Sequence, residues 1–199
     1  MKSVFFRAFE ESDYKIINEW RNDSELQKLT GGNFRFVSPE LEKKWVMEKS
    51  LNNKTEIYLA ICINDESKKM IGYLSFNKLD YINRSAEGGG IIIGDKNYRD
   101  GIIWIEIYQF MMTYAFDVLN LNRFYGVCLT QHKLTMTIMS ILFWTLEGVS
   151  KQVIYKNGHY HDLAMWAILR NEYYEHQRVG DYELKSILKR IKQFNMVKE

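Results

Sequence analysis

The most constraining feature of this chain is residues 86–101, which read AEGGGIIIGDKNYRDG. An apolar stretch typical of a strand runs into a polar loop that contains glycine, and the loop opens directly onto an apolar stretch typical of a helix. Backbone N–H groups in the first turn of a helix have no partner inside the helix, and the helix dipole adds about half a positive charge there. The segment therefore predicts a strand–loop–helix unit with an anion site, and it suggests a phosphorylated ligand.

The composition predicts one domain with a sizeable core. The chain has 199 residues, 46% of them hydrophobic, and can bury roughly 70% of its unfolded surface. Its formal net charge is only +2, and the basic residues are spread, so we expect no nucleic-acid partner. The most apolar stretch, residues 102–116, contains Glu106 and Gln109 and is shorter than the roughly 20 residues that span a bilayer. We therefore expect a buried helix there and no membrane partner.

The cysteine usage and the first residues favour a reducing compartment. Cys62 and Cys128 are far apart in the sequence, and each lies in an apolar, strand-like run. Thiols in such runs usually act as small hydrophobic groups, and the spacing is not that of a metal site. Arg7, Glu10 and Glu11 come too early to leave a secretory apolar segment. We expect a cytoplasmic protein without a bound metal.

Hydrophobic periodicity predicts strands interspersed with helices. Pro39 follows Ser38, a pair typical of a helix start, because serine caps the first turn and proline fits it. Asn157 and Gly158 lie between two apolar runs, which indicates a hairpin. The class is α/β (α+β) with a mixed sheet. In chain order we expect strands at 4–9, 57–63, 70–76, 90–93 and 124–129, two hairpin strands around 156–158, and helices from about residues 13, 39, 102 and 132.

At this point the chain resembles a known family. The order of elements, the strand–loop–helix at 86–101, LNLNRF at 119–124, LEG at 146–148 and YKNGHYHD at 155–162 are similar to the GNAT superfamily of acetyl-CoA-dependent N-acetyltransferases. Within it, the chain looks most like the branch of ribosomal-protein N-terminal acetyltransferases and spermidine acetyltransferases. The resemblance covers about residues 1–172 and leaves 173–199 as a helical extension of the same domain. It implies a twisted mixed sheet of about six to seven strands, flanked by helices, with a splayed central parallel pair.

The resemblance implies that acetyl-CoA lies where two central parallel strands separate, here the strands at 90–93 and 124–129. Its pyrophosphate would sit on the loop before the long helix, and no metal is implied. The cofactor-binding positions carried over in this way are Ile91, Ile93, Asn97, Tyr98, Arg99, Asp100, Gly101, Ile102 and Ile103.

The loop departs from the family pattern of Arg or Gln, two residues, Gly, one residue, and Gly or Ala. If Arg99 is its first residue, Ile102 and Trp104 fill both small positions. If Gly101 is the first glycine, which is the register we prefer, Tyr98 replaces Arg or Gln and Ile103 replaces the second small residue. Glycine at such a site lets the backbone approach the ligand, so a bulky residue is expected to weaken or reposition the phosphate contacts.

Acyl transfer from a thioester to an amine needs a base for the amine and a donor for the carbonyl oxygen. Glu87 is our candidate base, because the family often has a carboxylate there that faces the acceptor; the alternative is a solvated glutamate at a strand end. Ribosomal-protein acetyltransferases place a serine and a glutamate where this chain has Thr135 and Ile154. Many other members have a tyrosine that acts as the general acid where this chain has Met139. The acid is therefore unassigned, with Thr135 as the candidate.

The acceptor is expected to be a small-molecule or peptide amine. Trp20 and Arg21 belong to a segment that resembles the acceptor side in this branch, and Tyr160 is a further candidate; the alternative is a core tryptophan beside a surface arginine. The acceptor could be a protein N-terminus, a polyamine, an amino sugar or an antibiotic. A rival interpretation is a GNAT-like binding or regulatory module without catalysis, suggested by the altered loop, Met139 and Ile154.

The C-terminal segment predicts one more helix. Asp181 is placed to cap it, and its apolar stripe consists of Leu184, Ile187, Leu188 and Ile191. The stripe is expected to pack on its own domain or to cover a neighbour in a homodimer.

Overall fold

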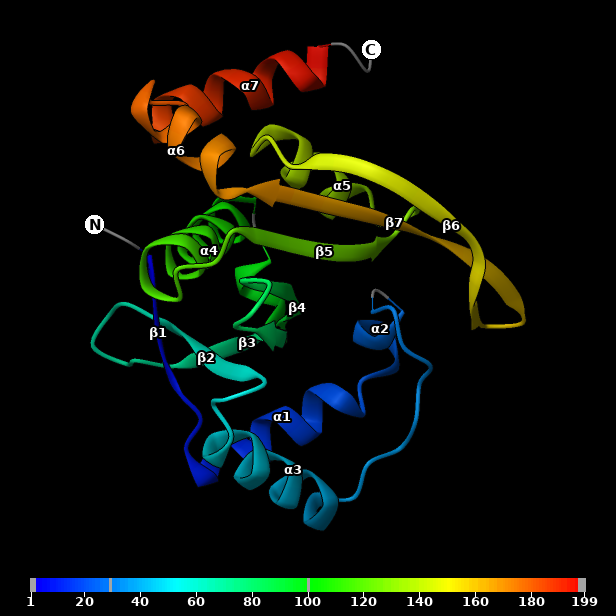
Figure 1. The fold of residues 1–199 in the computed structure, drawn as a ribbon. Coiled ribbons are helices and arrows are strands. Elements are labelled where there is room, and N and C mark those ends of the chain that lie inside the picture. The colour runs from blue at the N-terminus through cyan, green and yellow to red at the C-terminus, as the bar shows by residue number, and fades with distance from the viewer. Residues whose placement is uncertain (1–2, 29, 100, 197–199) are drawn as a thin grey trace.

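The structure is a computed structural model that describes residues 3–28, 30–99 and 101–196. A single sheet of seven strands runs through the molecule in the order β1-β2-β3-β4-β5-β7-β6 (Figure 1). The strands are β1 (Val4–Ala8), β2 (Ile57–Ile63), β3 (Met70–Asp80), β4 (Ser85–Ile93), β5 (Arg123–Leu129), β6 (Thr145–Lys156) and β7 (His159–Leu169).

Helices lie between and after the strands. Before the second strand come a 3-10 turn η1 (Glu11–Asp13), α1 (Tyr14–Arg21), α2 (Ser24–Gln27) and α3 (Pro39–Leu51). After β4 come a 3-10 turn η2 (Lys96–Tyr98), α4 (Gly101–Thr113) and a π-helical turn η3 (Tyr114–Val118), and α5 (Lys133–Ile141) follows β5. The chain closes with α6 (Arg170–Arg178) and α7 (Leu184–Met196).

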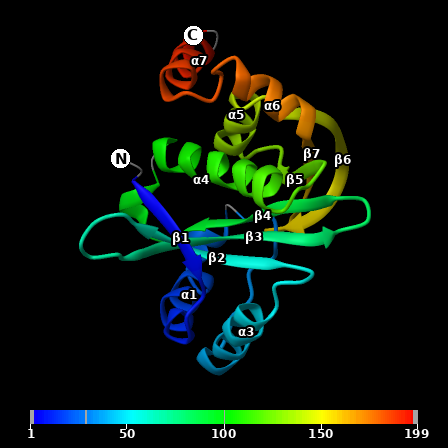
Figure 2. The same cartoon turned by 60° about the vertical axis from the view of Figure 1, so that its left-hand side comes forward.

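The helices cover the two faces of the sheet unequally. Figure 2 shows α1 and α3 on one face, beneath β1, β2 and β3, with α4 on the other face. Two apolar clusters fill these layers. One includes Trp20 and Val46 beneath the first strands, and the other includes Phe124 and Met111 on the side of α4 and α5. On the α1 side, α2 lies beside the β6–β7 hairpin (Figure 1), where Lys156 of β6 donates to the carbonyl oxygen of Gln27.

The parallel pair β4 and β5 is joined over a short distance. Ser85, Ala86 and Glu87 pair with Arg123, Phe124 and Tyr125, and the two strands separate beyond these residues. All other neighbouring strands pair antiparallel. Gly90 has a φ of +60° at an irregularity in the β3–β4 pairing. A left-handed residue of this kind bends a strand, which carries β4 away from β5.

The C-terminal helices extend the core. Ile187 of α7 is fully buried in the larger cluster, and the guanidinium of Arg190 donates to the carbonyl oxygen of Ile141 in α5 at 3.0 Å. The prediction that Asp181 caps this helix is wrong, because its carboxylate pairs with His176 and Arg190 instead. Leu184 and Leu188 remain 55% and 40% exposed, so the homodimer stays a prediction.

Most predicted elements are present, and the main difference lies in β4. The strand begins at Ser85, five positions before the predicted start at residue 90. Its middle consists of three glycines, which have low strand propensity and masked the pattern. The helix α6 was not predicted, since RNEYYEHQR has few apolar residues to set a period.

Candidate functional site

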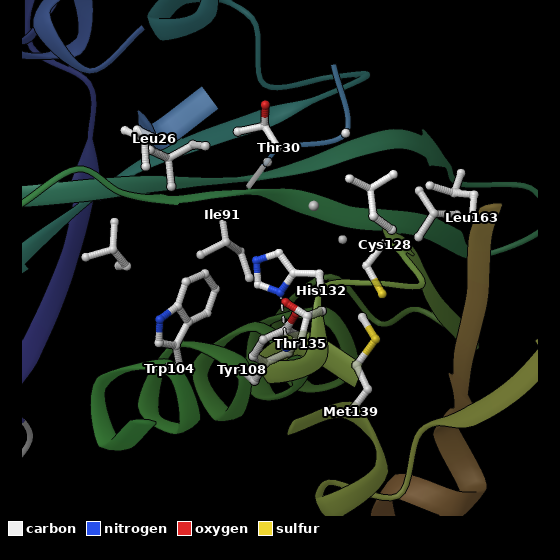
Figure 3. Close-up of a pocket in the computed structure, with 18 of the residues that line it drawn as sticks. Leu26, Thr30, Ile91, Trp104, Tyr108, Cys128, His132, Thr135, Met139 and Leu163 are labelled. Carbon is white, nitrogen blue, oxygen red and sulfur yellow. Dashed lines mark hydrogen bonds between the residues drawn. The ribbon is translucent and has the colours of Figure 1, made fainter. Parts of the chain in front are cut away.

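A cavity of about 200 Å³ lies where β4 and β5 separate. Figure 3 shows that its walls come from both sides of the sheet, with Trp104, Tyr108, Thr135 and Met139 on the α4 and α5 side and Leu26 and Thr30 on the α2 side. It therefore passes through the gap between the strands. The lining residues of β4 and β5 are Gly88, Gly89, Gly90, Ile91, Ile92, Ile93, Val127, Cys128 and Leu129, and the remainder are Leu26, Thr30, Gly31, Arg99, Trp104, Tyr108, His132, Thr135, Met139 and Leu163.

Three successive glycines shape the β4 wall. A Cβ at Gly88 would lie 2.2 Å from the ring of Phe124, and one at Gly90 would lie 2.6 Å from the hydroxyl of Ser75. Side chains at these two positions are thus excluded by close packing. At Gly89 a Cβ would meet no atom within 4 Å. The glycines leave the backbone of β4 bare on the cavity side.

The polar groups of the cavity gather at the start of α5. His132 is the N-cap of this helix, and its Nδ1 accepts the backbone N–H of Thr135 at 3.3 Å. The phenol of Tyr108, reaching across from α4, lies against the side chain of Thr135. The thiol of Cys128 contacts the sulfur of Met136 at 3.5 Å. An imidazole, a hydroxyl, a phenol and a thiol therefore meet on one wall.

Burial keeps these groups uncharged at neutral pH. It raises the pKa of Tyr108 far above its usual range and that of the Cys128 thiol to about 11. It lowers the pKa of His132, because the imidazolium would lose its hydration. The wall consequently offers neutral hydrogen-bonding groups rather than ions.

The opposite wall is held by a lysine from a distant hairpin. Lys156, at the end of β6, is buried, and its ammonium group donates to the carbonyl oxygens of Gln27 and Thr30. Since Thr30 and Gly31 line the cavity, this contact joins the β6–β7 hairpin to the loop after α2. Burial lowers the pKa of Lys156.

The loop between β4 and α4 is fixed by its own side chains. Asp95 accepts the backbone N–H of Asn97 at 3.0 Å and pairs with Lys69 at 2.7 Å, contacts that lower its pKa. The guanidinium of Arg99 donates to the carbonyl oxygens of Ile93 and Gly94 at 2.8 and 2.9 Å. The basic side chains of Lys69 and Arg99 thus lie at this loop, together with the half-buried carboxylate of Asp95.

The sequence matches the family described as the acetyltransferase (GNAT) domain over residues 3–142. This match covers well over half of the chain. The chain belongs to this GNAT acetyltransferase family.

Relatives span nearly the whole of this GNAT chain. An uncharacterized N-acetyltransferase, YnaD, of Bacillus subtilis strain 168 is 24% identical over 172 residues, or 86% of this chain and 96% of its own. The spermidine N(1)-acetyltransferase of Vibrio cholerae serotype O1 is 25% identical, with 84% and 93% covered. The crystal structure of spermidine N-acetyltransferase from Vibrio cholerae in complex with CoA and spermine is similar in fold, with a TM-score of 0.77 at 22% identity over 86% of this chain and 98% of that one.

The described residues contain no helix that is both long and apolar enough to cross a membrane. Nor do the described side chains include three or more His, Cys, Asp or Glu residues grouped so that they could hold a metal ion.

The predicted cofactor residues of this GNAT domain fall into two groups. Ile91, Ile93 and Arg99 line the cavity. Asn97, Tyr98, Gly101 and Ile102 form the loop and the start of α4, outside that lining, and Asp100 lies outside the described residues.

Ile103, which replaces the second small residue of the family pattern, lies in the first turn of α4. Its side chain is buried in the core cluster with Ile63 and Ile107 rather than displayed toward the loop. A helix presents its first-turn N–H groups along its axis, whereas side chains point sideways. At Gly101 a Cβ would meet no atom within 4 Å, and weaker phosphate contacts caused by Ile103 stay a prediction.

The two predicted catalytic residues lie on opposite faces of the sheet, and only Thr135 lines the cavity. Thr135 is buried and lines the cavity. Glu87 is not part of the lining; it follows core-facing Ala86 and precedes Gly88, which faces Phe124, so it points to the other face of the sheet. There its carboxylate pairs with Lys78 at 2.7 Å.

The predicted acceptor residues do not line the cavity. Trp20 is buried against Gly94, and the guanidinium of Arg21 lies 3.4 Å from Glu42 and stacks over Trp45 at 3.9 Å. Tyr160 is 64% exposed on the hairpin and packs on Tyr155.

The sequence interpretation missed four residues that shape the site: Tyr108, His132, Lys156 and Trp104. His132 directly precedes a helix, and Trp104 and Tyr108 are four residues apart on another, so a helical wheel could have paired these two rings. Lys156 had no signal, because its partners are backbone carbonyls more than a hundred residues away.

Proposed function

We propose that this protein transfers the acetyl group of acetyl-CoA to a primary amine by direct attack in a ternary complex within the cavity. The observation that carries the proposal is the separation of β4 from β5 after three residue pairs, which opens a cavity through the sheet. One substrate can then enter from each side. Membership of the acetyltransferase family supplies the reaction class.

The β4 wall fits the extended arm of CoA. Beyond Glu87 this strand has no ladder partner in β5, and Gly89 leaves space above its backbone. The pantetheine arm of CoA carries two amides, and an extended chain with amides adds to a free strand edge through main-chain hydrogen bonds. The apolar isoleucines of β4 match its methylene groups.

The loop before α4 fits the anionic end of the same molecule. The helix start at Gly101 is open to close approach, and helix starts favour phosphate groups. Lys69, Lys96 and Arg99 place positive charge around this loop, although Asp95 offsets part of it. Thus the phosphates have a site without the full family glycine pattern.

Glu87 supports the acceptor half of the proposal. It lies on the face opposite α4, where the amine would arrive, and a carboxylate there can take the amine proton directly or through water. The amine nitrogen then attacks the thioester carbon, and collapse of the intermediate expels the thiolate of CoA. Since thioesters are activated, positioning supplies much of the rate.

Calorimetric titration with acetyl-CoA and an amine screen that monitors free thiol test this function. The panel contains spermidine, spermine, amino sugars, aminoglycosides and peptides with free N-termini. We expect binding tighter than millimolar, the range below about −4 kcal/mol, and turnover with at least one amine. A Gly89→Leu variant should lose binding because it fills the cavity, whereas Gly32→Leu, also at an uncrowded glycine, should bind as the parent does.

The alternative function is a CoA-binding module without catalysis. Binding of acetyl-CoA without thiol release for any amine in the panel would favour that module. Absence of binding at millimolar acetyl-CoA would contradict both functions.

A further inference from the structure

His132 is held in one orientation by the helix that it caps. Its Nδ1 accepts the N–H of Thr135 at 3.3 Å, and Figure 3 shows the imidazole between Thr135 and Ile91, projecting into the cavity. Within the described residues, no hydrogen-bond partner is present for Nε2. The ring therefore has one nitrogen committed to the backbone and one directed at whatever occupies the cavity.

The cap determines which nitrogen carries the proton. A nitrogen that accepts an N–H cannot itself be protonated, so the neutral ring carries its hydrogen on Nε2. Protonation of Nδ1 would break the cap and place a positive charge at the positive end of the dipole of α5. The other titratable groups that line the cavity are Tyr108, Cys128 and Arg99, and none of them carries a negative charge that would stabilise an imidazolium.

We propose that neutral His132 donates its Nε2–H to the carbonyl oxygen of the acyl group during transfer, as a catalytic electrophile; this inference rests on the proposed function. The amine nitrogen forms a bond to the carbonyl carbon, and the π electron pair moves onto the oxygen that His132 contacts. The carbonyl then re-forms, the carbon–sulfur bond breaks, and its electron pair leaves on sulfur. The amine proton goes to the base, and His132 keeps its own proton throughout.

The alternative role of proton donor to the thiolate is chemically unfavourable for this ring. Loss of Nε2–H from a neutral imidazole would leave an imidazolate, which is far more basic than a thiolate. A fixed neutral donor in a water-poor cavity, in contrast, stabilises a developing oxyanion without reorganising. The hydroxyls of Thr135 and Tyr108 lie against each other, whereas Nε2 of His132 has no hydrogen-bond partner within the described residues.

Two variants separate the donor from the cap. In His132→Asn, the amide oxygen occupies the place of Nδ1 and keeps the cap, but nothing replaces Nε2. In His132→Gln, the amide nitrogen reaches the place of Nε2 but the cap acceptor is lost. We expect the Asn variant to melt as the parent does and to lose roughly 10²–10³ in kcat, the usual effect of removing one oxyanion donor. The Gln variant should melt lower yet stay within about tenfold of the parental kcat.

A purely structural cap predicts the reverse order, with His132→Gln the slower enzyme, and that result would overturn the proposal. Acetyl-CoA affinity, measured by calorimetry, should be similar in all three proteins, so that the loss appears in kcat rather than KM. A second readout needs binding alone: the infrared band of the ¹³C-labelled thioester carbonyl of bound acetyl-CoA should shift to lower frequency in the parent and the Gln variant, and less in the Asn variant.

The outcomes distinguish this inference from the proposed function. Parental kcat in His132→Asn, or an identical carbonyl band in His132→Asn and parent, removes His132 from the chemistry while acetyl transfer stands. A parent that binds no acetyl-CoA contradicts the proposed function and this inference together. If the parent binds acetyl-CoA but acetylates no amine, the carbonyl band alone decides whether His132 is the donor.

Discussion

The ammonium group of Lys156 donates to the carbonyl oxygen of Thr30 at 2.5 Å, across 126 positions of sequence. The same group also contacts the carbonyl of Gln27. Because Thr30 lines the cavity, the tip of the β6–β7 hairpin determines where one wall stands. A substitution at Lys156 should therefore affect both the stability of the hairpin and substrate binding at this wall of the cavity.

Lys156→Met keeps the aliphatic stem and removes the donor. Two carbonyl oxygens then lose a charged hydrogen bond, so we expect a loss of about 1–3 kcal/mol of stability and a higher KM for the amine. Thermal unfolding and steady-state kinetics measure the two effects. Lys151→Met, at an exposed position of the same strand, is the matched control; equal behaviour of both variants would contradict a role for the contact.

Glu87→Gln removes the candidate base and keeps its shape. If Glu87 accepts the amine proton, turnover should fall by roughly 10²–10⁴ while acetyl-CoA affinity stays close to the parental value. The Lys78 partner allows a control, since Lys78→Gln frees the carboxylate without removing it and should not abolish turnover. Steady-state kinetics with an acceptor from the amine screen measure turnover, and calorimetry measures the affinity for acetyl-CoA.

Thr135→Val removes the hydroxyl from the α5 wall of the cavity and keeps a side chain of similar volume. A hydroxyl that takes part in the reaction predicts slower turnover at unchanged stability, whereas a packing role predicts no kinetic change. Parental speed in Glu87→Gln together with a slow Thr135→Val would place the chemistry on α5 rather than β4.

The lowered pKa of His132 predicts a pH-dependent contribution to stability. A base with a depressed folded-state pKa binds fewer protons in the folded than in the unfolded chain, whose histidine has a pKa of about 6.5. Its contribution is therefore fully present above that value and is lost as the pH falls toward the lower, folded-state pKa. Urea unfolding from pH 8 to pH 5 should show a steeper acid loss in the parent than in His132→Asn, and parallel curves would contradict this.

Ile187→Ala tests the attachment of α7. A fully buried isoleucine cut to alanine should cost about 2–5 kcal/mol, because Ile187 belongs to the main core. Leu184→Ala, on the same helix but 55% exposed, should cost far less. Denaturant unfolding compares them, and light scattering of Leu184→Ala tests whether the exposed stripe holds a second copy.

Elements with a clear local pattern were predictable from the sequence, because an apolar run or a helix cap needs no tertiary information. The apolar run 57–63 and the Ser38–Pro39 start of α3 are examples, and both elements are confirmed. The start of β4 was not predictable, since Gly88 and Gly90 owe their presence to the close approach of Phe124 and Ser75. Such contacts exist only after the chain has folded.

The candidate site was predictable only where family resemblance supplied positions. Ile91, Ile93 and Thr135 line the cavity, whereas Ile103 packs in the core, an orientation that a spacing pattern does not reveal. The orientation of His132 depends on a single backbone hydrogen bond at a helix start. The sequence shows a histidine before a helix, and only the geometry shows which nitrogen is left over.

The three-pair contact between β4 and β5 makes the sheet two smaller sheets joined by a narrow seam. Hydrogen bonds between neighbouring strands join β1, β2, β3 and β4 in one half and β5, β7 and β6 in the other. A molecule bound there would contact both halves, and because it binds only the folded chain it would raise the free energy of unfolding by RT ln(1 + c/Kd), where c is the free ligand concentration. The melting temperature of this protein should therefore report what fraction of its cavity is occupied by ligand.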